Sequence, residues 1–240
     1  MSFYNELSKY YKYIFPTNQS TVDFLINHFS SDENILDIAC GSGEYTVSLA
    51  KNNYDIIGID LETEMIEKAT EKAKEDNLKV TFQVGNMLFL DDKFEANSIG
   101  GIFCIGNSLV NLDTIEDVKL SLESMYRILK FNRILVIQIV NYDRILKFNL
   151  TGLPTIINEK AKIEFIRDYV YENSKISFNT TLKTVDGVFY NSVKLLPLTS
   201  NSLTTLLKEI GFKDINLYGG FNKSKFDINN FIPLVLTCKK

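Results

Sequence analysis

Residues 34–65 read NILDIACGSGEYTVSLAKNNYDIIGIDLETEM, and this stretch decides the fold. An apolar run over 35–40 predicts a buried strand, which ends in a glycine turn over 41–43. A helical pattern follows over 44–51, and a second apolar run over 56–59 predicts another strand that ends on an acid. A strand, glycine turn, helix, strand and acid in this order are typical of the half-fold that binds nucleosides.

The parts of this unit suit a nucleoside ligand. Gly41 and Gly43 have no Cβ, so the backbone can reach φ > 0 and pass close to a ligand. Asp60 ends the second strand, where a carboxylate can accept hydrogen bonds from both hydroxyls of a ribose. The alternative is any parallel βαβ unit with a turn glycine and a capping acid. Because Asp37 also stands at a strand end, we favour nucleoside binding.

The glycine spacing argues against two nucleotide classes. The dinucleotide fingerprint is G-x-G-x-x-G/A, and its third position falls here on Thr46, which argues against NAD or FAD. The sequence contains no GxxxxGK[ST] pattern, so a P-loop site is not expected. The segment LDIACGSG at 36–43 instead resembles the first motif of class I S-adenosylmethionine (SAM) methyltransferases. Ala39 stands where many members have glycine, a small change that we expect to be tolerated.

The resemblance implies a set of cofactor contacts. The glycine turn would lie along the methionine part of SAM, and Asp60 would hold the ribose. Leu61 and Met65 would pack on the adenosine. Asn86 stands where many relatives have aspartate, and its amide oxygen can still accept from the adenine amino group, while Met87 covers a ring face. The expected cofactor-binding residues are Tyr11, Asp37, Ala39, Gly41, Gly43, Asp60, Leu61, Met65, Asn86, Met87, Ile105 and Gly106.

The N-terminal segment NELSKYYKYIFP, residues 5–16, resembles the first helix of many small-molecule methyltransferases. In that family the helix folds over the cofactor, and one of its tyrosines touches the methionine end. Tyr11 is the best match to this tyrosine and Tyr13 is the alternative. The tyrosines are equally well explained as residues that pack a short helix against the sheet. We expect residues 1–30 to form a helical cover.

Two further segments resemble glycine and sarcosine N-methyltransferases. They are GNSL at 106–109 and NYD at 141–143. In those enzymes GNS lines the mouth shared by cofactor and substrate, and the asparagine of NYD faces the substrate. The resemblance therefore points to Asn107, Ser108 and Asn141. The same segments occur in uncharacterised bacterial relatives, so they do not fix the substrate.

Residues 147–197 interrupt the sheet with patterns typical of antiparallel strands. Alternation predicts strands over 163–170, 175–185 and 188–195, with Asp186-Gly187 as a hairpin turn. We expect a β-rich lid that excludes water and selects the acceptor. In glycine-type enzymes a lid arginine holds the acceptor carboxylate. The matching place here is Lys194, which cannot form a bidentate fork, and this argues against glycine as the substrate.

The acceptor pocket has no assigned catalytic residue, because the sequence shows no His/Asp dyad. Tyrosines of the lid could line this pocket or form a cation cage, although ordinary packing of strand aromatics explains them too. The acceptor-pocket candidates are Asn107, Asn141, Tyr169, Tyr171 and Lys194.

The remaining patterns complete an α/β fold. We expect a doubly wound, seven-stranded, mostly parallel sheet in the order 3-2-1-4-5-7-6, with the last strand antiparallel, as in the family. The SAM-binding domain would comprise residues 1–146 and 198–240, with the lid, residues 147–197, inserted between strands five and six. Lys130 to Arg133 would form the turn before strand five, with Asn132 at φ > 0.

Composition limits the partners. A chain of 240 residues with 45% apolar side chains can fill a core, and a net charge of −4 gives no basic footprint for nucleic acid. We find no run of the ~18 apolar residues that a membrane span needs and no signal peptide, so we expect a cytoplasmic protein. Three distant cysteines and one histidine predict no protein-bound metal. We expect a monomer or homodimer.

These observations predict a SAM-dependent methyltransferase. It would transfer a methyl group to a nitrogen or oxygen of a small-molecule acceptor by in-line SN2, which mainly requires orientation and exclusion of water. One alternative is a SAM-fold protein that lacks activity and serves as a binding or partner subunit. A nucleotide-dependent oxidoreductase is a further alternative that the glycine spacing disfavours.

Overall fold

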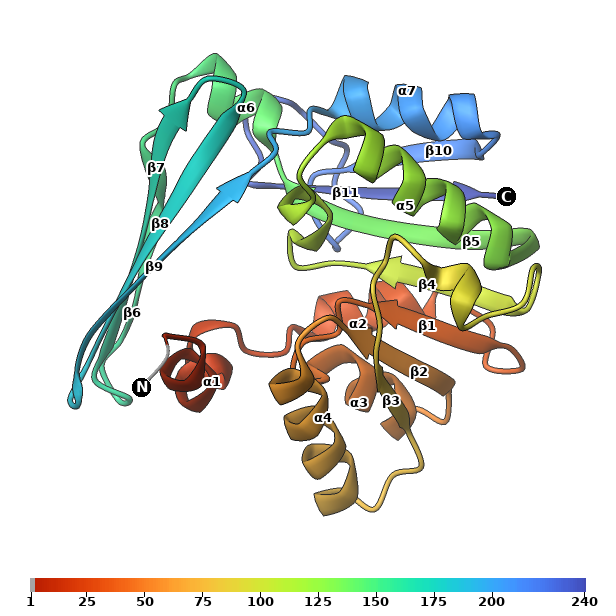
Figure 1. The fold of residues 1–240 in the computed structure, drawn as a ribbon, viewed down its shortest axis with the longest axis horizontal. Helices are drawn as coiled ribbons and strands as arrows, with labels where there is room; N and C mark the ends of the chain where they lie inside the picture. Colours follow the sequence, from red (N-terminus) through yellow and green to blue (C-terminus); the bar gives the residue numbers. More distant parts are fainter. Residues whose placement is uncertain (1–2) are drawn as a thin grey trace.

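The computed structural model describes residues 3–240, which form two β-sheets and the helices around them (Figure 1). The α-helices are α1 (Phe3–Ile14), α2 (Gln19–Ile26), α3 (Glu44–Lys51), α4 (Thr63–Glu75), α5 (Ile115–Ile128), α6 (Tyr142–Lys147) and α7 (Ser200–Ile210), and the short 3-10 turns are η1 (Leu90–Asp92) and η2 (Ser108–Asn111). The strands are β1 (Asn34–Ile38), β2 (Asp55–Asp60), β3 (Thr81–Val84), β4 (Ile99–Cys104), β5 (Leu129–Val140), β6 (Gly152–Asn158), β7 (Ile163–Glu172), β8 (Lys175–Thr184), β9 (Gly187–Leu195), β10 (Lys213–Tyr218) and β11 (Pro233–Lys239).

The main sheet has the predicted topology. Its order is β3-β2-β1-β4-β5-β11-β10, which is 3-2-1-4-5-7-6 when its own strands are counted along the chain. Strands β1 to β5 pair in parallel, and β11 runs antiparallel between β5 and β10. The sequence prediction of a doubly wound, Rossmann-like sheet is therefore confirmed.

Apolar side chains fill both faces of this sheet. All six residues of β4 are buried, because helices cover the sheet on both sides. One face packs against α5 and α7, and the other packs against α2 and α3 (Figure 1). The carboxyl ends of the parallel strands therefore all open at one edge, where ligands bind in folds of this class.

A second sheet, which we call the lid, stands across that edge (Figure 1). It is fully antiparallel in the order β6-β7-β8-β9. Three of its strands were predicted, whereas β6 was not. The expected hairpin lies between β8 and β9, but its two-residue turn is Val185-Asp186, one residue earlier than the predicted Asp186-Gly187, because Thr184 pairs with Gly187. None of the helices within residues 3–240 is long and apolar enough to cross a membrane.

Candidate functional site

The glycine turn between β1 and α3 contains three residues with positive φ. They are Ala39 at 59°, Gly41 at 54° and Gly43 at 76°. A Cβ on Gly43 would lie 2.9 Å from the ring of Phe82, so this glycine is required by packing within the protein. A Cβ on Gly41 would meet no protein atom within 4 Å. Gly41 therefore borders the open side of the turn, where a ligand can approach the backbone.

Ala39 occupies a conformation that suits glycine better. The left-handed conformation of an L-residue destabilises the folded protein by roughly 1–2 kcal/mol. Replacing the residue by glycine has an opposing effect of about 0.4–1 kcal/mol, because glycine gives the unfolded chain more conformational entropy. We expect Ala39→Gly to raise the free energy of unfolding by up to about 1 kcal/mol, measured by urea denaturation. Ala50→Gly in α3 is the control and should lower it by about 1 kcal/mol. Destabilisation by both changes would contradict the argument.

Asp60 lies at the end of β2, beside the turn. Its Oδ2 accepts a hydrogen bond from the backbone N–H of Gly41 at 2.8 Å, and its Oδ1 accepts one from that of Glu62 at 3.0 Å. Each carboxylate oxygen can accept a second hydrogen bond. The carboxylate is thus held in place with one acceptor position left on each oxygen, which fits the two hydroxyls of a ribose.

Asp37 lies deeper, at 3% exposure, and Thr46 donates a hydrogen bond to its Oδ2 at 2.5 Å. Burial raises the pKa of this carboxyl group to about 8, and the neighbouring Asp60 charge adds to the rise, although the Thr46 hydrogen bond opposes it. Asp37 is consequently protonated at neutral pH. It joins β1 to α3 behind the turn rather than presenting a charge on its surface.

Helix α1 brings Tyr11 to this group of acids. Burial raises the pKa of Tyr11 to about 12, and negative charge on Glu44, Tyr45, Asp60 and Asp37 contributes. The tyrosine hydroxyl therefore lies close to the acids that surround the glycine turn. By contrast, the alternative Tyr13 is 40% exposed. Of the two predicted tyrosines, Tyr11 is the one that the structure brings to the cofactor residues.

The predicted adenosine side is partly formed by exposed side chains. Leu61 is 62% exposed, and Met65 and Met87 are partly buried. The amide oxygen of Asn86, which was expected to accept from the adenine amino group, accepts a hydrogen bond from the backbone N–H of Leu88 at 3.0 Å. This contact fixes the side chain and leaves one acceptor position on the oxygen. An exposed leucine beside a strand-end acid is a suitable platform for a base.

At the end of β4, Ile105 is buried and Gly106 has φ of 81°. The backbone N–H of Gly106 donates to the side-chain oxygen of Gln138 on β5 at 2.8 Å. This contact joins the ends of β4 and β5 at the edge that faces the lid. Sequence reasoning did not select Gln138, since nothing in the local pattern shows which group would receive the Gly106 N–H.

Asn107 uses its side chain within the protein. Its oxygen accepts from the backbone N–H of Val140 at 2.9 Å, and its Nδ2 donates to the hydroxyl of the fully buried Tyr142 at 3.1 Å. Its φ of 69° places it in the left-handed region, where asparagine is favoured. In this state Asn107 links β4, β5 and α6 instead of offering its amide to an acceptor.

The NYD segment is a structural junction. Asn141, at 1% exposure, caps α6 by accepting from the N–H of Arg144, and it donates to the carbonyls of Ile228 and Phe231. Asp143 accepts from the backbone N–H of Ser200 at the start of α7. These contacts fasten α6 to the β10–β11 loop and to α7, and they use the side chain of Asn141 within the protein instead of presenting it to an acceptor.

The remaining acceptor candidates lie on the lid. Tyr169 is buried against Phe178, and the Tyr171 hydroxyl donates to the carbonyl of Leu150 at 2.8 Å. Lys194 alternates with the inward-facing residues of β9, is 63% exposed and pairs with Glu172 at 3.2 Å. Lys194 therefore points away from the sheet edge, and this placement gives no support to a role in holding an acceptor.

Arg167 on β7 is a residue that sequence reasoning missed. It lies on the same face as the buried Phe165 and Tyr169, and the strand register places Thr180 and Asn191 beside it. Its Nε is buried and has no hydrogen-bond partner among the described residues, while its NH2 donates to the carbonyl of Pro154. Desolvation lowers the pKa of this guanidinium. These residues form a polar row on the inner face of the lid.

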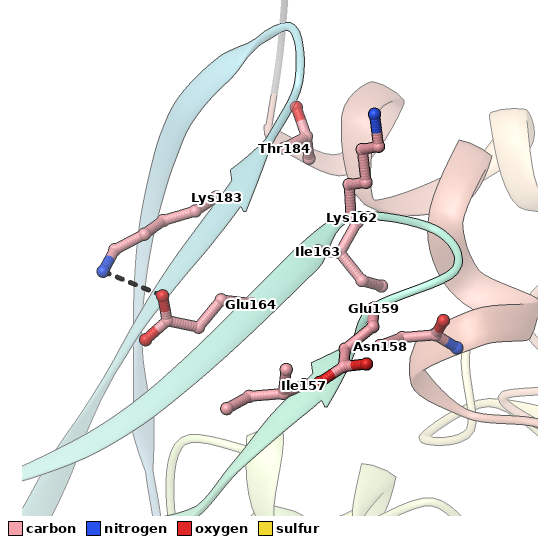
Figure 2. Close-up of a pocket in the computed structure, with 8 residues that line it drawn as sticks. All are labelled: Ile157, Asn158, Glu159, Lys162, Ile163, Glu164, Lys183 and Thr184. Carbon is pink, nitrogen blue, oxygen red and sulfur yellow. Dashed lines mark hydrogen bonds and ion pairs between the residues drawn. The ribbon is translucent and has the colours of Figure 1, made fainter.

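Two hollows lie elsewhere on the molecule. Figure 2 shows one of about 290 Å³ at the far end of the lid, where Lys183 pairs with Glu164 at 3.1 Å. Another of about 370 Å³ lies at the root of the lid between Arg144, Leu153 and Asp168. Neither is lined by any residue of the predicted cofactor site. Within residues 3–240, we find no group of three or more side chains that could hold a metal ion.

A family described as "Methyltransferase domain" matches residues 29–209, which include the glycine turn, both strand-end acids and the whole lid. The chain belongs to this family. It is a class I SAM-dependent methyltransferase, and SAM is its cofactor.

Relatives of this methyltransferase include N-methyltransferases. It is 28% identical over 198 residues to a glycine/sarcosine N-methyltransferase of Aphanothece halophytica, with 79% of this chain and 70% of that protein covered. It is 27% identical to a glycine/sarcosine/dimethylglycine N-methyltransferase of Actinopolyspora halophila, with 80% of this chain covered but only 33% of that longer protein. A SAM-dependent methyltransferase of Clostridium acetobutylicum has the same fold, with a TM-score of 0.80 at 18% identity and 98% of both chains covered.

Proposed function

We propose that this methyltransferase methylates the amine nitrogen of a small acceptor that also carries a carboxylate. SAM supplies a methyl group that is electrophilic because it is bonded to a sulfonium. The proposed cofactor site consists of the glycine turn, Asp60 and Tyr11, with Leu61 and Met65 on the adenosine side. The observations that support it are the open side of Gly41 and the free acceptor positions of Asp60.

Arg167 is the residue that we propose to bind the carboxylate of the acceptor. A guanidinium with a buried, unpaired Nε costs free energy unless an anion completes its hydrogen bonds, and a carboxylate matches its fork geometry. The polar row around it lies between apolar rows that contain Phe165 and Tyr169. An acceptor held there by its carboxylate would direct its amine toward the ends of β4 and β5. The N-methyltransferase relatives act on substrates of this chemistry, as their names state.

The test is an acceptor panel with formation of S-adenosylhomocysteine as the readout. Glycine, sarcosine and larger amino acids would be compared with ethanolamine and simple amines, which lack the carboxylate. We expect turnover with at least one amine that bears a carboxylate, and a kcat/KM for its alcohol analogue that is at least about tenfold lower. Turnover restricted to acceptors without a carboxylate would contradict the proposal.

Substitution of Arg167 gives a residue-specific prediction. Hydrogen bonds to a charged group contribute about 1.5–3 kcal/mol, so Arg167→Met should raise KM for the carboxylate acceptor roughly 10- to 150-fold. Arg167→Lys should recover part of this loss, since it restores the charge without the fork. Lys194→Met, on the outer face, is the matched control and should change KM less than about twofold. Equal effects at the two positions would contradict the role of Arg167.

A further inference from the structure

One carboxylate beside the glycine turn is not explained by the contacts described so far. Glu44 is the first residue of α3 and directly follows Gly43. Lys72 of α4 pairs with its Oε1 and also donates to the backbone carbonyl of Ser42 at 3.0 Å. The Ser42 hydroxyl donates to the same Oε1 at 3.3 Å. Both donors hold one oxygen, and among the side chains that the structure describes no group donates to the other oxygen, Oε2.

The position of Glu44 connects this carboxylate with the cofactor. Its side chain is only 20% exposed, and its charge acts on the hydroxyl of Tyr11. Three acids raise the pKa of that hydroxyl by their charge, and two of them have other roles. Asp60 lies at the ribose end of the site, and Asp37 is buried and protonated at neutral pH. Glu44 is the acid next to the turn that remains for a cationic group.

We propose that Glu44, held in place by Lys72, binds the α-ammonium group at the amino-acid end of SAM through its free oxygen. This rests on the cofactor placement proposed above. An ammonium needs an acceptor, and a carboxylate gives a stronger hydrogen bond than a neutral group. Lys72 is a positioning residue in this arrangement. It fixes the carboxylate and the Ser42 carbonyl together, so the turn and the acceptor oxygen keep their relative positions before the cofactor binds.

The experiment compares two ligands that differ at this end. S-adenosylhomocysteine has the amino-acid group, whereas 5′-methylthioadenosine lacks it, and calorimetry gives both affinities without turnover. Glu44→Gln should weaken S-adenosylhomocysteine roughly 10- to 100-fold and change methylthioadenosine less than about twofold. Lys72→Met should weaken S-adenosylhomocysteine by a smaller factor, about two- to fivefold. Glu71→Gln, exposed on the same helix as Lys72, is the control and should change neither.

The outcomes separate this inference from the cofactor placement. If Glu44→Gln weakens both ligands by the same factor, or weakens neither, the ammonium contact is wrong while the cofactor site stands. If the wild-type protein binds neither ligand, the cofactor site is wrong as well. Glu44→Asp keeps the charge on a shorter side chain, and it replaces Glu44→Gln if thermal melting shows that the latter does not fold. It should then weaken S-adenosylhomocysteine selectively, and a uniform effect on both ligands would overturn the proposal.

Discussion

Replacing Asp60 by alanine is expected to weaken the binding of SAM and of S-adenosylhomocysteine roughly 100-fold or more. The change removes the two free acceptor positions that we propose for the ribose hydroxyls, and each hydrogen bond to a charged group contributes about 1.5–3 kcal/mol. It also removes the acceptor of the Gly41 N–H, so the turn loses the contact that joins it to β2. The first effect acts on the bound state and the second also loosens the turn of the free protein, and calorimetric titration measures their combined effect on affinity.

Two further variants separate the charge from the fold. Asp60→Asn keeps one oxygen that can accept but loses the charge, so its affinity should lie between those of the wild type and Asp60→Ala. Asp55→Ala removes an exposed acid at the opposite end of β2 and should leave the affinity within about twofold. Equal affinities of Asp60→Ala and the wild-type protein would remove Asp60 from the ribose site.

The parts of the fold that depend on local signals were predicted well. The bounds of α3 agree with the helix predicted over 44–51, because a glycine turn precedes it and sets where it begins. Asn132 has the expected positive φ of 59°, but it lies inside β5 and not in a turn before it. Strand β5 already pairs with β4 at Leu129, and the register shifts before Ile134, which absorbs the extra residues.

Strand β6 was missed for a physical reason. Its sequence, GLPTIIN, contains a glycine and a proline, which normally argue against a strand. Strand β6 is an edge strand and pairs only with β7. Proline is tolerated there, because the N–H that Pro154 lacks is not needed for pairing with a second neighbouring strand. Helix α6 was missed as well, since six residues after the cap Asn141 are too few for a clear helical period.

The candidate site also contains residues that local sequence signals predict and residues that only the three-dimensional structure reveals. Residues of the glycine turn and Asp60 follow from a continuous stretch of sequence, and the structure brings them together with Tyr11. Arg167 could not be identified from a continuous stretch of sequence. Strand register and contact with the main sheet decide which residues lie on the inner face of the lid. Lys194 was selected as the match to a lid arginine of glycine-type enzymes, and that match does not show which face of β9 the side chain occupies.

Asp37 should make the stability of the protein depend on pH. Its pKa rises from 3.8 in the unfolded chain to about 8 in the folded protein, mainly through burial. Between these values the folded protein keeps a proton that the unfolded chain releases. The contribution of Asp37 to the free energy of unfolding therefore decreases as pH rises. Its contribution is fully present below pH 3.8 and is lost progressively up to about pH 8.

The variant Asp37→Asn removes this dependence, because asparagine does not titrate and its oxygen can still accept from Thr46. Urea denaturation of both proteins at pH 5 and pH 7.5 gives the test. The stability difference between them should move by about 3 kcal/mol in favour of the variant over this interval, at 1.36 kcal/mol for each pH unit. Asp32→Asn, at an exposed loop position, controls for the change in net charge and should leave the difference constant.

A parallel pH dependence in the wild type and Asp37→Asn would show that Asp37 is already ionised in the folded protein. In that case the acid behind the glycine turn would carry a charge at neutral pH, and it would compete with Glu44 for a cationic group of the cofactor. If the dependence disappears in the variant, the neutral Asp37 leaves Glu44 and Asp60 as the charged acids around Tyr11. The same denaturation data therefore decide which carboxylates can act on the bound cofactor.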